Sequence, residues 1–596
     1  MKRTRQIFRK QGKLRARVAF ALLLAMTLGH AGCFLDEAVE RYAGRIVVPR
    51  SQEFHWSDGG LPQTFDPAFA AAPPDTDLVR AIFEGLTDYD PRSLAPVPAV
   101  ATRWEPSNGG RVWTFYLRDD ARWSNGEPVT AGDFVQSWRR IVKIGALAPH
   151  TDLLANIDGP HRREPAHSPS TLGISTKPIN PNSGPKDNSP AIDPDRGFGA
   201  EAVSDGVLRV RLRRPDMNFP ALVAHPVFRP VKLKDGYTTT RLIPDDLVSN
   251  GAFSLARTGT DRVLLERANH YWGKQQVTLD RVEFMGASDP ESALAAYRAG
   301  DVDAVTNAAF EPLAIKLLTP YEDFRRTTYS ALTYYTFNTS HEPFDDVRVR
   351  EALALGFDRE RVSADDLGGA TEPAKRFLPE AVSDSRKPVV EKSELLEKDY
   401  DRARSLLAEA GYPDGEGFPR IRLLINRNEQ QRIVAQSIAA MWRSVLNVET
   451  EIVVKNWEDY EAAARAGDYD VVRRGMVMQT TDELTNIRAL FEGGFEPSNY
   501  GAGITSPSGS ESPETTTARQ VTGRQGRLGT IPPIETESQA LNDLSAMPIY
   551  FASSYALVKP YVKGFDSNVL DAPSLKTVRI DNGWKQPEIA GSGWVR

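Results

Sequence analysis

The chain has 596 residues, of which 40% are hydrophobic and 26% are charged, and its formal net charge is −6. This length exceeds what one hydrophobic core supports, so we expect several domains, and the composition excludes a chain that is disordered throughout. The acidic balance argues against a nucleic-acid partner, because the phosphates would be repelled.

The first 32 residues have the pattern of an export signal. Eight Lys and Arg residues in positions 2–17 precede an apolar run, Val18–Leu28, and the segment ends in small residues before Cys33. This order of charge, short apolar run and small residues is typical of a secretory signal peptide, and the run is short for a membrane span. Its removal leaves 65 basic against 79 acidic side chains, a net charge of −14.

Cys33 is the only cysteine, so a disulfide within the chain is excluded. Its place after Ala31 and Gly32 resembles the lipobox of bacterial lipoproteins, although His30 stands where an aliphatic residue is usual. This resemblance implies acylation of Cys33 and attachment of the mature chain to a membrane. The alternative is cleavage nearby and a soluble protein.

The first half of the chain reads as strands with one clear helix. Val112–Leu117 alternates between two faces, and Thr130 and Asp133 form a helix-start pattern before an apolar stripe at Phe134, Trp138 and Ile141. Residues 161–198 are rich in Pro, Ser, Asn and Gly and predict an inserted surface loop. Further strands are predicted at Arg45–Pro49, Val207–Leu212, Asn250–Leu255, Arg262–Arg267 and Leu279–Phe284.

The second half predicts an α/β unit. Asp346 and Asp399 each precede a helix with an apolar face. A strand at 421–425, a helix stripe at 434–445 and a strand at 448–454 then follow, an order that favours parallel strand pairs. Residues 501–536 are low in complexity, which leaves open either a harmless loop or loss of part of this unit.

Several segments are similar to those of the bacterial extracellular solute-binding proteins that capture peptides for ABC importers. The similarity covers roughly residues 45–490 and resumes near Met547. It is carried by the segments Ala81–Asp90, Trp104–Gly110, Trp113–Trp138, Tyr334–Thr339, Pro343–Leu353, Ala403–Pro413, Met547–Tyr550 and Leu557–Gly564.

This resemblance implies an α/β fold of the type II periplasmic binding protein class, in the style of family 5, with two lobes and an extra subdomain on the first. The expected divisions are a signal peptide (1–32), a tether (33–44), lobe I (45–75 and 226–325), the extra subdomain (76–225), lobe II (326–500), the low-complexity loop (501–536) and a return to lobe I (537–590).

The resemblance also implies a peptide site. In similar proteins a strand carries an Arg for the peptide carboxylate and, several residues on, an Asp for its amine. Here Arg473 keeps the first position, whereas Gln479 stands at the second. A neutral amide loses about 1–3 kcal/mol of charge-assisted hydrogen bonding, so capture of a free amino terminus is in doubt.

Four further residues are expected to line the site by the same resemblance. Trp457 matches a tryptophan that lines the peptide site in similar proteins, with a plain core aromatic as the alternative. Tyr550, Leu61 and Pro62 correspond to strand edges that face the ligand. An acidic residue expected near Leu61 is absent.

The sequence carries no recognisable catalytic motif. It lacks Gly-x-Ser-x-Gly, His-Glu-x-x-His and a phosphate loop, and its eight histidines lack ligand spacing. We therefore expect no enzyme, metal or cofactor, but a monomeric peptide-binding component that delivers its ligand to an ABC permease. The alternatives are a binder of another solute, such as a nickel chelate or a sugar, and a sensor or degenerate scaffold without transport.

Overall fold

The computed structural model describes residues 41–159, 197–233, 242–244, 247–380, 395–491 and 533–587. The expected signal peptide and Cys33 lie outside the described residues, as do all but the last few positions of the 161–198 and 501–536 segments.

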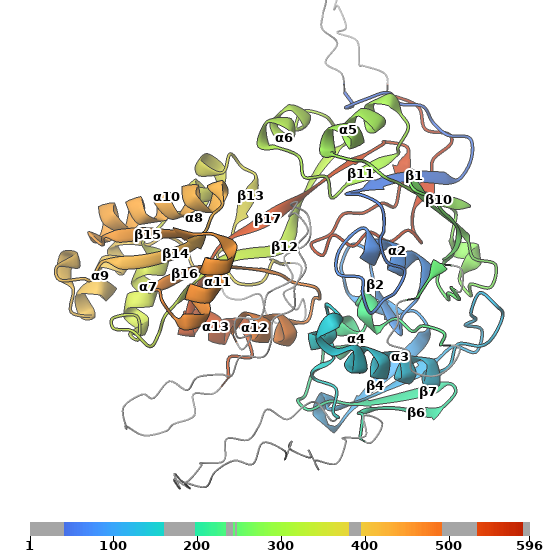
Figure 1. Ribbon diagram of the computed structural model, residues 1–596, viewed down its shortest axis with the longest axis horizontal. Helices are drawn as coiled ribbons and strands as arrows, with labels where there is room; N and C mark the ends of the chain where they lie inside the picture. The colour runs from blue at the N-terminus through green and yellow to red at the C-terminus, as the bar shows by residue number, and fades with distance from the viewer. Residues whose placement is uncertain are drawn as a thin grey trace, which may run out of the picture.

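Within the described residues, one eleven-stranded sheet runs through both lobes (Figure 1). Two long strands at its centre, β12 and β17, join the lobes, and their pairing shifts register between Thr328 and Leu332. The strand order is β15 (Thr450–Lys455), β14 (Ile421–Asn426), β16 (Val471–Val477), β12 (Phe324–Phe337), β17 (Ala546–Val558), β11 (Ala304–Thr306), β1 (Glu53–Asp58), β10 (Arg281–Met285), β9 (Arg262–Arg267) and β8 (Phe253–Thr258), with β13 (Thr371–Pro373) beside β17.

Lobe I is built around β1, which pairs in parallel with β10 and β11. Trp56 on β1 is fully buried, lies 5.1 Å from the ring of Phe284 and donates from its indole nitrogen to Thr306 at 2.7 Å. Helices α5 (Pro290–Ala299) and α6 (Pro312–Leu318) cover the end of this lobe at the top of Figure 1.

The extra subdomain has its own sheet, in the order β4 (Ala101–Ser107), β5 (Val112–Leu117), β7 (Val207–Arg211) and β6 (Ala200–Ser204). Helix α3 (Ala131–Ile144) packs on it and starts with the predicted capping box: the Thr130 hydroxyl accepts from the Asp133 amide, and the Asp133 carboxylate accepts from the Thr130 amide at 2.8 Å. The predicted stripe of Phe134, Trp138 and Ile141 is buried.

Lobe II is the predicted α/β unit, with β14 parallel to β15 and β16. Successive residues of β14 face opposite sides: Leu423 packs with Val434 of α10, and Leu424 packs with Tyr460 of α11. The helices are α7 (Val347–Leu355), α9 (Tyr400–Glu409), α10 (Glu429–Leu446) and α11 (Trp457–Ala466), and Asp346 and Asp399 cap α7 and α9 as predicted.

Shorter elements connect these units. They are α2 (Asp75–Ile82), β2 (Thr87–Tyr89), β3 (Pro96–Pro98), α4 (Phe219–Leu222), α8 (Arg359–Arg361), α12 (Glu483–Phe491), α13 (Glu537–Asp543), β18 (Val562–Lys563) and β19 (Arg579–Ile580).

The strand predicted at Arg45–Pro49 is wrong, because the segment is irregular and the first strand starts at Glu53. Isolated contacts replace a ladder there: the Arg45 amide donates to the Arg298 carbonyl at 2.9 Å, and the Pro49 carbonyl accepts from the Asn582 side chain. Among the helices of the described residues, none combines the length and the apolar character that crossing a membrane requires.

Candidate ligand-binding site at the lobe junction

Parallel strands end together at one edge of lobe II. Helices α10 and α11 begin directly beyond the carboxyl ends of β14 and β15, and Asn428 and Asn456 cap them by accepting from backbone amides. Ligands of open α/β sheets bind outside the carboxyl ends of the strands, where helix starts present free amides. This edge is therefore the candidate site of lobe II.

Arg473 and Tyr550 lie on one face of the central sheet at this edge. Arg473 pairs with Tyr335 on β12, and Tyr550 pairs with Thr333, two residues away on the same strand, so their side chains share a face. Both are almost fully buried, and the Tyr550 hydroxyl accepts from the Gln431 side chain of α10 at 2.8 Å. The structure thus places two of the expected site residues on the same sheet face, on strands separated by β12.

Trp457 lies at the first position of α11 and is 44% exposed. Its ring is 5.5 Å from the ring of Tyr460, whose hydroxyl donates to the Arg473 carbonyl. Because nearly half of the indole surface is open, Trp457 is not a plain core aromatic. It offers a flat apolar surface linked through Tyr460 to the strand of Arg473.

Gln479 lies two residues beyond β16, and its side chain faces the His225 ring of the extra subdomain. Burial lowers the pKa of His225 well below its usual value, and the nearby His150, whose ring is 4.8 Å away, lowers it further. Gln479 therefore meets a neutral imidazole where lobe II approaches the extra subdomain.

Leu61 and Pro62 follow β1 at the corresponding edge of lobe I. Leu61 packs on Gly286, just beyond β10, where an added Cβ would come within 3.0 Å of the leucine Cγ. Gly59 has a positive φ of 64° and lies against Asn307, just beyond β11. The carboxyl ends of three parallel strands therefore meet at this loop, although Pro62 itself is buried.

A contact between the extra subdomain and lobe II escaped the sequence analysis. Asp216 and Asp482 are 5% and 1% exposed, and their carboxyl groups are paired with each other. Burial raises the pKa of both, and the charge of Asp482 raises that of Asp216 further. Arg214 and Glu535 add an ion pair of 2.7 Å across the same boundary.

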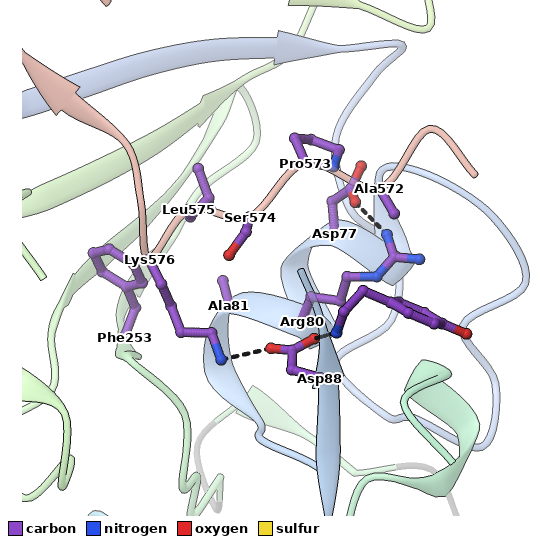
Figure 2. A pocket seen from close by; sticks show the side chains of 11 residues that line it. Asp77, Arg80, Ala81, Asp88, Phe253, Ala572, Pro573, Ser574, Leu575 and Lys576 are labelled. Atoms are coloured by element: carbon purple, nitrogen blue, oxygen red, sulfur yellow. Dashed lines mark hydrogen bonds and ion pairs between the residues drawn. The ribbon is translucent and has the colours of Figure 1, made fainter. Parts of the chain in front are cut away.

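A small cavity between the extra subdomain and lobe I also holds charged groups that the sequence analysis did not single out (Figure 2). On one side Arg80 contacts Asp77 at 2.7 Å, and on the other Lys576 contacts Asp88 at 2.5 Å. Although burial alone would raise it, the charges of Lys576 and Arg229 lower the pKa of Asp88 to about 2. These ions are matched by one another across the boundary, so the cavity is an internal charge cluster.

Acidic residues gather behind this cavity. Asp58 accepts from Thr306 and Asn307 and lies against Asp77. Burial, followed by the charge of Asp58, raises the pKa of Asp571 to about 6. Within the part of the chain that the structure describes, no group of three or more His, Cys, Asp or Glu residues could hold a metal ion.

Comparison with known proteins identifies the family. Residues 95–496 match the model of the bacterial extracellular solute-binding proteins, family 5 Middle. The chain belongs to this family.

Members of family 5 with curated names are similar over most of their length. The periplasmic murein peptide-binding protein MppA of Escherichia coli is 28% identical, over 90% of this chain and 94% of its own. The periplasmic oligopeptide-binding protein OppA of the same organism is 27% identical, over 92% and 95%. The probable deoxycholate-binding periplasmic protein YgiS, also of that organism, is 28% identical, over 86% and 90%.

Comparison with solved structures also finds the two-lobed family 5 fold. The unliganded open form of MppA superposes with a TM-score of 0.67 at 27% identity and covers 90% of this chain and 98% of its own. The expected fold class, two lobes with an extra subdomain on the first, is thereby confirmed.

Proposed function

We propose that this protein is the substrate-binding component of an ABC importer, which captures peptides outside the inner membrane and delivers them to a permease. The observation that carries the proposal is the buried Arg473, on the same sheet face as Tyr550, at the strand edge where open α/β sheets bind ligands. Similarity to murein peptide-binding and oligopeptide-binding proteins over nine-tenths of the chain supports it.

Each expected site residue has a physical role in this proposal. Arg473 pairs with the peptide carboxylate, because a terminal charge buried without a partner costs several kcal/mol. Trp457 stacks on a side chain, and Tyr550, Leu61 and Pro62 bound the extended backbone. Gln479 accepts from the amine without supplying a charge.

Substitution of Arg473 tests the carboxylate role. Arg473→Ala should weaken binding of peptides with a free carboxyl end by about tenfold to a hundredfold, as expected for loss of a charge-assisted hydrogen bond. Binding of amidated peptides should weaken much less. Isothermal titration calorimetry on matched peptide pairs measures both.

Arg474→Ala is the matched control, because Arg474 is adjacent on β16 but faces the other side of the sheet. Arg473→Lys keeps the charge and should retain part of the preference for a free carboxyl end. Equal losses for free and amidated peptides in Arg473→Ala would contradict the assignment.

Location and assembly follow from the same role. The chain is exported, is anchored through acylated Cys33 and acts as a monomer with a membrane permease. Its family consists of solute-binding proteins, and we assign it no catalytic step or cofactor.

A non-peptide solute is the second candidate, favoured by the similarity to a probable deoxycholate-binding protein and by the open indole of Trp457. Native mass spectrometry of the purified mature protein separates the alternatives. A retained peptide supports peptide import, a bile-salt-like, sugar or nickel-chelate mass supports the second candidate, and an empty site favours a sensor or degenerate scaffold.

A further inference from the structure

The surface at the start of the described chain contains an arginine-lined hollow. Its lining includes Arg41, Arg45 and Arg298 with Tyr42 and Tyr321. All three arginines are exposed. Arg41 pairs with Glu322 at 2.6 Å, and the Arg45 backbone is bonded to that of Arg298, which fixes the hollow to α5.

An exposed apolar face lies on helix α6, which precedes Tyr321 in the chain. Leu313 and Leu317 of α6 lie one helical turn apart and are 67% and 62% exposed. Tyr321, which lines the hollow, follows α6 along the chain, and its amide donates to the carbonyl of Leu318 at 3.0 Å. Val47, the residue after the 41–46 segment that lines the hollow, is 50% exposed. Arginines and exposed apolar side chains therefore lie at the same end of lobe I, which α5 and α6 cover.

The length of chain before this surface limits what can cover it. Seven residues separate Cys33 from Arg41, so a fully extended tether spans at most about 28 Å. If Cys33 carries the anchor, Arg41 stays within that distance of the lipid, with the rest of the hollow beside it. A tether this short keeps the effective concentration of the surface near the bilayer high, so a weak contact suffices.

We propose that this end of lobe I is a membrane-docking surface, in which Leu313 and Leu317 enter the headgroup layer and Arg41, Arg45 and Arg298 contact lipid phosphates. The proposal rests on the anchor at Cys33 and adds an orientation to it. Bilayer interfaces accept apolar side chains flanked by arginine, and anionic leaflets attract basic clusters even on acidic proteins. Docking would fix lobe I and leave lobe II free to move about β12 and β17.

The nearby acidic residues limit the attraction. Glu322 is paired with Arg41, and Asp301 and Glu311 are exposed on the flanking loops. These three acids equal the three arginines in number, so the surface is close to neutral, and docking should depend on the anchor and the leucines together, not on charge alone. Soluble protein without an anchor should bind vesicles weakly.

The single cysteine makes a direct test possible. The mature chain beginning at Cys33 is coupled through its thiol to a maleimide phospholipid in vesicles of phosphatidylethanolamine and phosphatidylglycerol, which supplies an anchor whatever the natural processing. Hydrogen exchange read by mass spectrometry should show the α6 amides roughly fivefold slower on the vesicle than in solution. Intact mass of the exported protein separately tests natural acylation, and calorimetry separately tests peptide binding.

Leu313→Ser/Leu317→Ser should abolish this protection, whereas Leu147→Ser, at a leucine 79% exposed on the extra subdomain, should leave it unchanged. Arg45→Glu/Arg298→Glu should reduce it on anionic vesicles. Equal exchange on and off the vesicle, or protection that survives loss of both leucines, would overturn the proposal. Protection seen only at high protein density on the vesicle would indicate a second copy as the occupant and would also overturn it.

Discussion

Single residues hold the loop that follows β1 of lobe I in place. Asp66, which follows the segment carrying Leu61 and Pro62, is fully buried and accepts from the guanidinium of Arg140 at 2.9 Å. It also accepts from the amides of Ala68 and Leu242, each at 3.0 Å. One carboxylate thus ties the loop, helix α3 and a distant segment together.

Asp66→Ala should lower the free energy of unfolding by about 3–5 kcal/mol, because it leaves the Arg140 guanidinium buried without its carboxylate. Urea unfolding followed by tryptophan fluorescence measures the change. Asp401→Ala is the control, because its ion pair with Arg404 is exposed and should contribute little. A loss at Asp66 no larger than at Asp401 would show that the buried pair does not hold this loop.

At the scale of elements, helix α3 shows how far local signals determine structure. The Thr130–Asp133 capping box is present, and the Asp133 carboxylate also accepts from the indole of Trp123 at 3.3 Å. The cap therefore sets where the helix starts and joins it to the preceding turn.

Thr130→Ala should destabilise the first turn of α3 by about 1 kcal/mol, which is roughly a fivefold increase in local amide exchange. Native-state hydrogen exchange of the 131–135 amides measures it. Thr130→Ser retains the hydroxyl and should restore most of the protection. Identical exchange rates in the alanine and serine variants would show that the Thr130 hydroxyl does not stabilise the first turn of α3.

At the scale of the whole molecule, the lobes meet through groups that respond to pH. Asp216 and Asp482 must share a proton to stay in contact, and Glu483 beside Asp482 opposes ionisation. Tyr89 of the extra subdomain packs in the hydrophobic cluster of lobe II. Burial raises the pKa of its hydroxyl to about 12. The pKa of both aspartates is raised where the lobes touch, so the contact is favoured at low pH. It weakens as the pH rises from about 4 through the raised pKa values.

We therefore expect the ligand-free protein to be more compact at pH 5 than at pH 8, as measured by small-angle X-ray scattering. Asp482→Asn should reduce the difference, because its amide donates to Asp216 at any pH. Glu535→Gln, which alters the neighbouring ion pair with Arg214, should retain the difference in compactness between pH 5 and pH 8. The same pH difference in Asp482→Asn would show that this pair does not govern the lobe contact.

Local patterns allowed much of the fold to be predicted. Alternation over Val112–Leu117, the caps at Thr130, Asp346 and Asp399, and the strand–helix–strand order of lobe II all act within a few residues, so neighbouring side chains suffice. Arg45–Pro49 had strand-like composition but no partner strand, and a strand exists only where a second strand accepts its hydrogen bonds.

The site could be predicted only in part. Arg473, Trp457 and Tyr550 stand within or beside predicted elements, and the structure gathers them at the strand edge of lobe II. The roles of these residues remain proposals, as do those of Leu61, Pro62 and Gln479. The pairs Asp216–Asp482 and Arg214–Glu535 could not be predicted, since the latter is 321 residues apart and no local pattern encodes such a distance.

The sequence by itself determined the elements, the α/β class and the resemblance to family 5, because periodicity and capping are properties of adjacent residues. Only the tertiary structure decided that the extra subdomain meets lobe II through a pair of carboxyl groups, and that arginines and leucines share one end of lobe I. These features depend on burial and on contacts between distant segments, which exist only once the chain has folded.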